Sequence, residues 1–405
     1  MTSADTSRLD RRIESSRRAA KSAVAAMIGV LFAGSTAVTP LYIMYKQAFG
    51  FSQITLTLIY AVYVIGNLCG LLLFGRLSDQ AGRRPVAAAS MVLAIASALV
   101  FLFAHGVGAL YLARILSGLA VSVGVGTGTA WLAELIDEQS KSRATVIATS
   151  ANFIGLGIGA LIAGLLAEYL PWPLHLTYVV YLLALFAVAA VVLMAPETVS
   201  KPRPALQDLS IRPRISVPRD IRAQFVAPAV TGFGSLALVG FYAALAPSLL
   251  ANQLHVTSHA IAGAIFLELA VFVAGAIVVT RSLSSRGSML LALALMPPSV
   301  ALVVAAQLAA SMVVLIIATA VCAVTAGLGY RGSLQVTNQI APPDQRAEMV
   351  SSYLICGFAG NALPVIGIGV ISTLAGATAA SLAFAATIII FAVVALYFGT
   401  RQPRS

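Results

Sequence analysis

The sequence predicts an all-α membrane protein whose twelve transmembrane helices form two pseudo-symmetric six-helix bundles. Three observations predict this fold. The 405 residues are 60% hydrophobic and only 10% charged, whereas soluble domains carry roughly 25% charged residues. Twelve apolar stretches are long enough to cross a hydrocarbon layer, which takes about 20 helical residues. Small and charged residues also recur between the two halves of the chain.

The predicted spans contain few charges, as hydrocarbon requires. We expect them at residues 22–44, 53–75, 86–104, 109–133, 144–167, 174–195, 223–250, 259–280, 288–309, 311–334, 349–373 and 377–399. Their only charged side chains are Arg114, Glu268 and Arg331, because an unpaired charge in hydrocarbon is costly. Such long unbroken runs exclude a transmembrane barrel, whose segments of about ten residues alternate in polarity.

The positive charges gather on one side of the predicted topology. The net charge is +11, and every Lys and Arg except Lys46 and Arg114 falls on the side that holds both termini when the loops alternate. Because cytoplasmic loops are enriched in Lys and Arg, both termini are expected in the cytoplasm. The alternative is a basic surface for acidic partners such as nucleic acid, which this placement disfavours.

The N-terminus and the cysteines indicate how the chain reaches its membrane. Residues 1–20 contain no short apolar core with a cleavage site, so we expect no removable signal peptide. Cys69, Cys322 and Cys356 all lie inside predicted spans, so no external disulfide is expected. We therefore predict a multi-pass plasma-membrane protein, located in the inner membrane if the cell is bacterial.

The chain divides into two matching halves. We expect an N-terminal cytoplasmic segment (1–21), a six-helix bundle (22–195), a cytoplasmic linker (196–222), a second bundle (223–399) and a cytoplasmic tail (400–405). The linker is rich in Pro, Lys and Arg, and its basic residues either lie on the anionic inner leaflet or form a solvated spacer. At one constant offset, Gly124, Gly126, Arg143, Gly157 and Gly164 recur as Gly327, Gly329, Arg346, Gly360 and Gly367.

The hairpin between the second and third spans carries the most specific pattern. Residues 75–85 read Gly-Arg-Leu-Ser-Asp-Gln-Ala-Gly-Arg-Arg-Pro. This stretch resembles the signature of the major facilitator superfamily, and the resemblance covers essentially the whole chain. Residues 111–118 and 196–198 resemble two further short motifs of the family. The resemblance implies a transporter whose two halves rock about a central site.

The resemblance also implies a gating latch on the cytoplasmic side. Asp79 is expected to face the positive end of the helix that begins near Arg346, and Arg83 or Arg84 is expected to meet Glu134. Such contacts close the inner gate in one state and break in the other, so each contributes about 1 kcal/mol. The alternative is that these charges only set the topology. The predicted latch residues are Gly75, Asp79, Gly82, Arg83, Arg84, Glu134, Arg143 and Arg346.

The charged residues within the spans are candidates for coupling and recognition. Glu268 lies about 14 Å along its span, where ionisation is costly and proton uptake is accessible. We expect Glu268 to couple transport to protons or to recognise a cation; the alternative is a protonated acid that bonds another helix. Arg114 is expected to gate, relay protons or orient an anion, or else to pin helices through backbone carbonyls. Arg331 lies near a span end, where its cation reaches water easily.

Polar and aromatic residues within the spans are candidates to line a substrate cavity. Each could supply a hydrogen bond or an aromatic wall, but for any single one of them an ordinary hydrogen bond between helices is the better interpretation. The candidates are Tyr42, Tyr60, Tyr63, Asn67, Trp131, Asn152, Tyr242, Arg331, Gln335 and Asn361. The small-residue face at 152–164 resembles a motif of drug and proton antiporters, but it lacks the proline of that motif.

The sequence predicts a secondary transporter that needs no cofactor. It contains no phosphate-binding Gly-Lys-Ser or Gly-Lys-Thr loop, no paired Cys or His metal set and no plausible catalytic triad, so an enzyme and a metal site are not expected. We expect a monomer that exports small amphipathic organic compounds or drugs in exchange for protons. The alternatives are a proton symporter that imports a small metabolite or organic anion, and a non-transporting membrane sensor.

Overall fold

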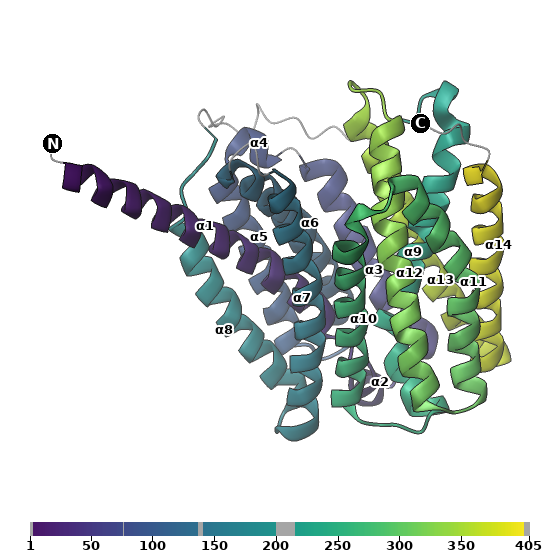
Figure 1. Ribbon diagram of the computed structural model, residues 1–405. Helices are drawn as coiled ribbons and strands as arrows, with labels where there is room; N and C mark the ends of the chain where they lie inside the picture. The colour runs from purple at the N-terminus through teal and green to yellow at the C-terminus, as the bar shows by residue number, and fades with distance from the viewer. Residues whose placement is uncertain (1–2, 76, 137–140, 200–214, 401–405) are drawn as a thin grey trace.

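The described part of the chain is entirely helical. The computed structural model describes residues 3–75, 77–136, 141–199 and 215–400, except for the side chains of 3–16, 141–143 and 145. Twelve helices in this part are long and apolar enough to cross a membrane, and they stand side by side in Figure 1. The predicted fold class and the number of spans are therefore confirmed. Parts of the predicted segments 1–21, 196–222 and 400–405 lie outside the described residues.

The helices follow one another with short connections. The first half contains α1 (Ser3–Ala37), α2 (Tyr42–Phe49), α3 (Gln53–Phe74), α4 (Leu77–Ala81), α5 (Arg83–Leu102), α6 (Val107–Leu135), α7 (Lys141–Tyr169) and α8 (Pro173–Leu193). The second half contains η3 (Arg219–Ile221), α9 (Arg222–Gln253), α10 (His259–Val279), η4 (Thr280–Ser282), α11 (Ser285–Leu308), α12 (Met312–Ile340), α13 (Arg346–Ala375) and α14 (Ala377–Thr400).

The first predicted span differs from the structure because it is broken into two helices. We expected one helix over 22–44, but α1 ends at Ala37 and α2 begins at Tyr42. Pro40 lies in the gap, where its ring and missing N–H oppose a continuous helix. In the second half, Pro247 lies near the end of α9 without breaking it, and the helix runs through this residue. The two halves therefore differ where α1 and α9 approach their ends.

Two pairs of helices hold the halves together. The helices α7 and α10 pack along each other, and so do α3 and α13. A Cβ atom on Gly263 of α10 would lie 2.5 Å from the Ala160 carbonyl oxygen of α7, and one on Gly369 of α13 would lie 2.2 Å from Thr57 Oγ1 of α3. Only glycine permits such close approach at these crossings.

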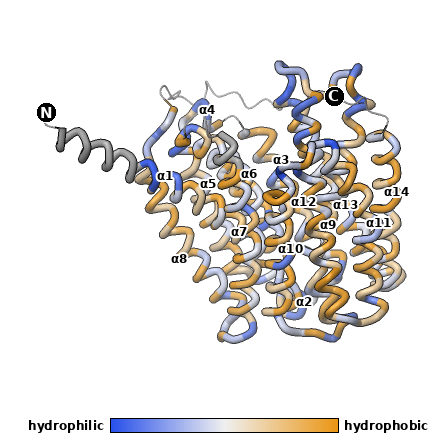
Figure 2. Tube along the Cα trace, in the orientation of Figure 1, coloured by the Kyte–Doolittle hydropathy of each residue, from blue (hydrophilic) through white to orange (hydrophobic). Residues whose placement is uncertain are grey.

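The two ends of the molecule are distinguished by their short helices. Figure 1 places α4 and the last turn of α14 at one end, which we call the α4 end, and places α2 at the other, which we call the α2 end. Figure 2 shows hydrophobic residues along α8 and α14 and hydrophilic residues around α4. Large apolar side chains of α8 such as Leu183 and Phe186 are exposed, as expected for a surface that faces lipid.

The helices α3 and α6 of the first half approach each other closely at Gly118. A Cβ atom on Gly118 of α6 would lie 2.2 Å from the Tyr63 carbonyl oxygen of α3, whereas Gly126 of the same helix has no neighbouring atom within 4 Å. Because the neighbour of Gly118 is backbone, no side chain can move aside. We expect Gly118→Ala to destabilise the protein by about 1–3 kcal/mol.

The same substitution at Gly126 is the matched control, and we expect no loss of stability there. Thermal unfolding of both variants in detergent checks the prediction. Equal melting temperatures for the two variants would contradict it.

Candidate functional site

The predicted latch region is organised around the buried guanidinium of Arg83. Arg83 is only 6% exposed, and its Nη2 and Nε donate to the two carboxylate oxygens of Glu134 at 2.6 and 3.2 Å. Its Nη1 donates to Ser78 Oγ at 2.7 Å and pairs with Asp79 at 2.5 Å. Two carboxylates thus neutralise one buried cation, and they tie α4, α5 and α6 together.

Glu197, in the segment after α8, caps the beginning of α5. Its carboxylate oxygens accept hydrogen bonds from the backbone N–H groups of Arg83 and Arg84 at 2.9 Å each. These N–H groups lie in the first turn of α5, so no carbonyl within the helix can accept from them. Glu197 also accepts from Thr198 and Val199 at 3.0 Å each. Burial alone would raise the pKa of Glu197, but these backbone donors hold the pKa below its ordinary value.

Gly82 allows this cap to form. It has φ 103°, in the region that favours glycine, and a Cβ atom there would lie 2.8 Å from Glu197 Oε2. The hydroxyl of Thr198 completes the cluster by donating to Glu134. Neither Glu197 nor Thr198 was predicted as a site residue, although both lie in a motif that the sequence singled out.

The other predicted latch residues lie apart from this cluster. Gly75 is the C-cap residue of α3. The side chain of Arg84 is exposed, and its backbone N–H donates to Glu197. Arg346 is the exposed first residue of α13, and the side chain of Arg143 lies outside the described residues. The described bonds of Asp79, Arg83 and Glu134 all stay within the first half.

Arg114 of α6 is a buried cation held by backbone carbonyls. It is 1% exposed, and it donates to the carbonyl oxygens of Ser35 at 2.8 Å and of Tyr60 at 3.4 Å. Its guanidinium also lies over the ring of Tyr63, 4.4 Å from the centroid. Ser35 belongs to the last turn of α1, whose carbonyls carry partial negative charge. The described ion pairs do not include Arg114.

A hydrogen-bonded path leads from this cation to the second half. The hydroxyl of Tyr60 donates to Asn361 Oδ1 of α13 at 2.8 Å, and Asn361 Nδ2 donates to the Leu236 carbonyl oxygen of α9 at 3.2 Å. Asn67 donates to the Tyr63 hydroxyl at 3.4 Å. The buried hydroxyls of Tyr42, Tyr45, Tyr178 and Tyr242 have no hydrogen-bond partner among the described atoms.

Glu268 is the carboxylate that lies deepest within a predicted span. It is half-buried on α10 and lies near Tyr242 of α9. The described hydrogen bonds and ion pairs give its carboxyl no partner. The residue before it, Leu267, packs against Gly157 of α7, so Glu268 lies beside the contact between the two halves.

Several residues that were predicted to line a substrate cavity instead donate hydrogen bonds to backbone carbonyls or lie apart from one another. Arg331 donates to the carbonyl oxygens of Thr280, Arg281 and Leu283 at 2.6, 3.0 and 3.2 Å, so it caps the turn after α10. Trp131 is fully buried and donates to the Pro196 carbonyl oxygen at 3.1 Å.

Gln335 and Asn152 also lie away from a common site. Gln335 is exposed and accepts from Ser285 Oγ at 3.1 Å. The Oδ1 atom of Asn152 is buried and has no described partner.

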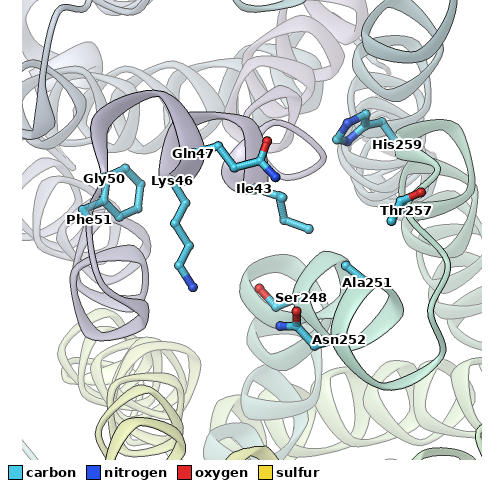
Figure 3. Close-up of a pocket in the computed structure, with 10 residues that line it drawn as sticks. All are labelled: Ile43, Lys46, Gln47, Gly50, Phe51, Ser248, Ala251, Asn252, Thr257 and His259. Atoms are coloured by element: carbon cyan, nitrogen blue, oxygen red, sulfur yellow. The ribbon is translucent and has the colours of Figure 1, made fainter.

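A cavity that the sequence did not predict opens at the α2 end. Its volume is about 610 Å³, and both halves contribute to it, as Figure 3 shows. Its lining residues are Ile43, Lys46, Gln47, Gly50, Phe51, Ser248, Ala251, Asn252, Thr257 and His259. The one signal in the sequence was the place of Lys46 on the otherwise cation-poor side. A second cavity of about 400 Å³ lies between α1, α7 and α8 and is lined almost entirely by apolar residues.

His259 links the two halves beside the first cavity. Its Nδ1 lies 3.1 Å from the Pro40 carbonyl oxygen in the break between α1 and α2, and because a carbonyl only accepts, Nδ1 is the donor. Its backbone N–H donates to Glu168 at the end of α7 at 2.8 Å. We call these contacts of His259, Pro40 and Glu168 the α2-end clasp.

The cap by Glu197 predicts a dependence of stability on pH. Because the folded pKa of Glu197 is lowered, its contribution is present above the unfolded pKa of about 4.3 and disappears as pH falls through the folded pKa. We expect Glu197→Gln to lower stability by about 0.5–1 kcal/mol at neutral pH. The difference from the wild type should shrink toward acidic pH.

Thermal unfolding across pH measures this difference, with Asp344→Asn in an exposed loop as the control. A difference that does not change between neutral and acidic pH would show that the ionised carboxylate is not what caps α5.

Because Arg114 donates to backbone carbonyls, substitutions at this position should change the stability of the protein according to whether a donor remains. Arg114→Met leaves the Ser35 carbonyl oxygen buried without its donor, which costs about 1–3 kcal/mol. Arg114→Lys keeps a cation that can still donate to a carbonyl oxygen, so we expect a smaller loss. Unfolding in detergent compares the two variants, and a methionine variant as stable as the lysine variant would argue against the capping role.

Comparison with known proteins identifies the family. A model of the Major Facilitator Superfamily matches residues 24–363. The MFS-type transporter paaT of Penicillium rubens is 29% identical over 152 residues, which are 38% of this chain and 28% of that protein. The efflux pump FUB11 of Gibberella fujikuroi is 30% identical over 126 residues, 31% of this chain and 22% of that protein. The matches thus span about a quarter of these curated relatives.

Solved structures extend the likeness over nearly the whole chain. The human organic anion transporter MFSD10 (TETRAN) gives a TM-score of 0.67 at 17% identity over 94% of this chain and 99% of that one. A bacterial homolog of the human lysosomal transporter Spinster gives 0.72 at 14% identity over 95% and 96%. At such identities the likeness shows the fold alone. With the family model matching most of its length, this multi-pass membrane chain belongs to the Major Facilitator Superfamily, and the relatives named here are transporters rather than enzymes.

Proposed function

We propose that the protein exports small amphipathic organic compounds in exchange for protons. The observation that carries this proposal is Glu268, a carboxyl within a membrane span that has no described partner. An unpaired carboxyl in such surroundings takes up and releases protons more readily than it remains permanently ionised. Its place beside the α7–α10 contact allows protonation to favour one arrangement of the halves over the other.

Alternating access is supported by where the halves touch. The bond from Tyr60 to Asn361, the α2-end clasp and the close approach of Gly369 to Thr57 all join the halves toward the α2 end. The charged cluster at the α4 end bonds only within its own half. We infer that the α2 end is closed here, and that rocking of the halves opens it and closes the α4 end.

The latch at the α4 end belongs to the other state of this cycle. We propose that closure brings Asp79 to the N-terminus of α13 near Arg346, where the helix dipole favours a carboxylate. Asp79 is 57% exposed as a side chain while it pairs with Arg83, so it is free to gain a second contact. The contact must break in every cycle, so its contribution is about 1 kcal/mol.

The relatives and the distribution of charge support the direction of transport and the orientation in the membrane. Among the relatives, FUB11 is described as an efflux pump, which favours export here. Cytoplasmic termini follow from the distribution of Lys and Arg, and they place the α4 end on the cytoplasmic side. We propose that a monomer in the plasma membrane carries out the cycle.

Replacement of Glu268 tests the coupling. In proteoliposomes, wild-type protein should move amphipathic compounds against a gradient when a pH difference is imposed, and the sign of proton movement should be that of exchange. Glu268→Gln keeps the size of the side chain but cannot ionise. We expect this variant to retain counterflow, and we expect its pH-driven accumulation of the compound to be at least tenfold lower than that of the wild type.

Asp220→Asn removes an exposed carboxyl in η3, away from the proposed latch and cavity; it is the control and should behave as the wild type. Undiminished pH-driven accumulation by Glu268→Gln would remove the proposed role of this carboxyl. Proton movement in the direction of the compound would replace export by symport, and binding without counterflow would indicate a sensor.

A further inference from the structure

The cavity at the α2 end has the size and the position of a binding site. Its volume of about 610 Å³ lies within the range of roughly 300–1,000 Å³ that is typical of sites for small molecules. One wall comes from α2 and the turn that follows it, and the other comes from the end of α9, the segment before α10 and the first residue of α10. Both halves therefore contact any occupant.

The lining of this cavity carries a positive charge and no negative one. Lys46 is the charged residue among the lining side chains, which include no Asp or Glu. Its Nζ donates to the neutral amide oxygen of Gln53 at 3.0 Å, and the described ion pairs give it no carboxylate. The nearby Glu168 already accepts from the backbone of His259. The ammonium thus keeps donors for another partner.

Polar groups across the cavity face the same space as Lys46. Figure 3 shows the Lys46 side chain extending from α2 toward Ser248 and Asn252 of α9, with Gln47 beside it. Amide and hydroxyl groups can donate to an anion, while Ile43 and Phe51 supply apolar surface. A cation, neutral donors and apolar walls together match a small organic anion that combines a carboxylate with an apolar body.

The other cations near the predicted transport path are already engaged. Arg114 donates to the carbonyl oxygens of Ser35 and Tyr60, and Arg331 donates to those of the turn after α10. Neither lines the cavity. Among these three cations, only Lys46 combines access to a cavity with the lack of a charged or backbone partner.

We propose that this cavity binds the carboxylate of the transported compound, with Lys46 as the residue that recognises its charge. The inference rests on the proposed transport function and narrows its substrates to organic anions. The cavity lies at the α2 end beside the clasp, whose His259 lines it, so it receives the compound when that end opens. Lys46 therefore selects for negative charge on this side of the membrane.

Binding to the purified full-length protein tests the site without requiring transport. The probes are benzoate, its neutral analogue benzamide and the cation benzylamine, compared by calorimetry in detergent at constant ionic strength. We expect wild-type protein to bind benzoate at least tenfold more tightly than either analogue. Lys46→Gln should weaken benzoate binding at least tenfold, whereas Lys46→Arg should stay within about threefold of the wild type.

Two controls keep the outcome interpretable. Arg219→Gln removes an exposed positive charge outside the cavity and should bind benzoate as the wild type does. The melting temperature of Lys46→Gln without benzoate should equal that of the wild type, since its described partner is a neutral amide. If Lys46→Gln melts early, the comparison of Lys46→Arg with Lys46→Met at matched stability decides the role of the charge.

The results separate the site from the proposed function. Absence of benzoate binding, or binding that survives Lys46→Gln, would overturn the anion site even if proteoliposomes still move other compounds with the pH gradient. Binding that depends on Lys46 in a protein that moves no compound would retain the site and overturn the transport proposal.

Discussion

A charge inside an apolar helix bundle must have a partner, and this protein provides many of its partners at helix ends. Arg114 donates to the last turn of α1, Arg331 to the turn after α10 and Arg286 to the Gly399 carbonyl oxygen at the end of α14. The last carbonyls of a helix have no partner within it and carry partial negative charge. A guanidinium placed there pairs with these carbonyl oxygens, so neither the cation nor the carbonyls need a carboxylate or another partner. Each such contact also fixes one helix against the end of another.

Because charged groups in such a bundle are normally paired, those without a charged or backbone partner are candidates for function. Most buried polar groups in proteins are paired, so an unpaired one indicates a ligand, a proton or a change of state. Glu268 has no described partner, and Lys46 has only the neutral amide of Gln53; the two have opposite charge and lie in different surroundings. Glu268 lies beside the packing of α7 on α10, and Lys46 lies in a cavity between the halves. The first suits a proton and the second an anion.

The sequence predicts local features well and contacts between distant segments poorly. Long apolar runs revealed all twelve spans, since spanning length follows from one chain segment alone. Pro40 and Pro247 show the limit, because the same residue type breaks α1 and is accommodated within α9. The pair of Arg83 with Glu134 was expected from a family resemblance, but the cap by Glu197 and the link from His259 to Pro40 join segments far apart in the chain. No pattern within one segment encodes them.

The described hydrogen bonds between charged side chains are concentrated within the first half, as the proposed rocking cycle requires. Within the first half, Arg83 makes charged bonds to two carboxylates while buried, and such bonds are among the strong ones in proteins. Between the halves, the described bonds are few: neutral bonds from Tyr60 to Asn361 and from His259 to Pro40, and one bond from the His259 backbone N–H to the Glu168 carboxylate. A net contribution of about 1 kcal/mol is typical of a neutral hydrogen bond. In the proposed cycle the halves move as rigid bodies, because their separation breaks few hydrogen bonds and leaves the charged bonds of Arg83 intact.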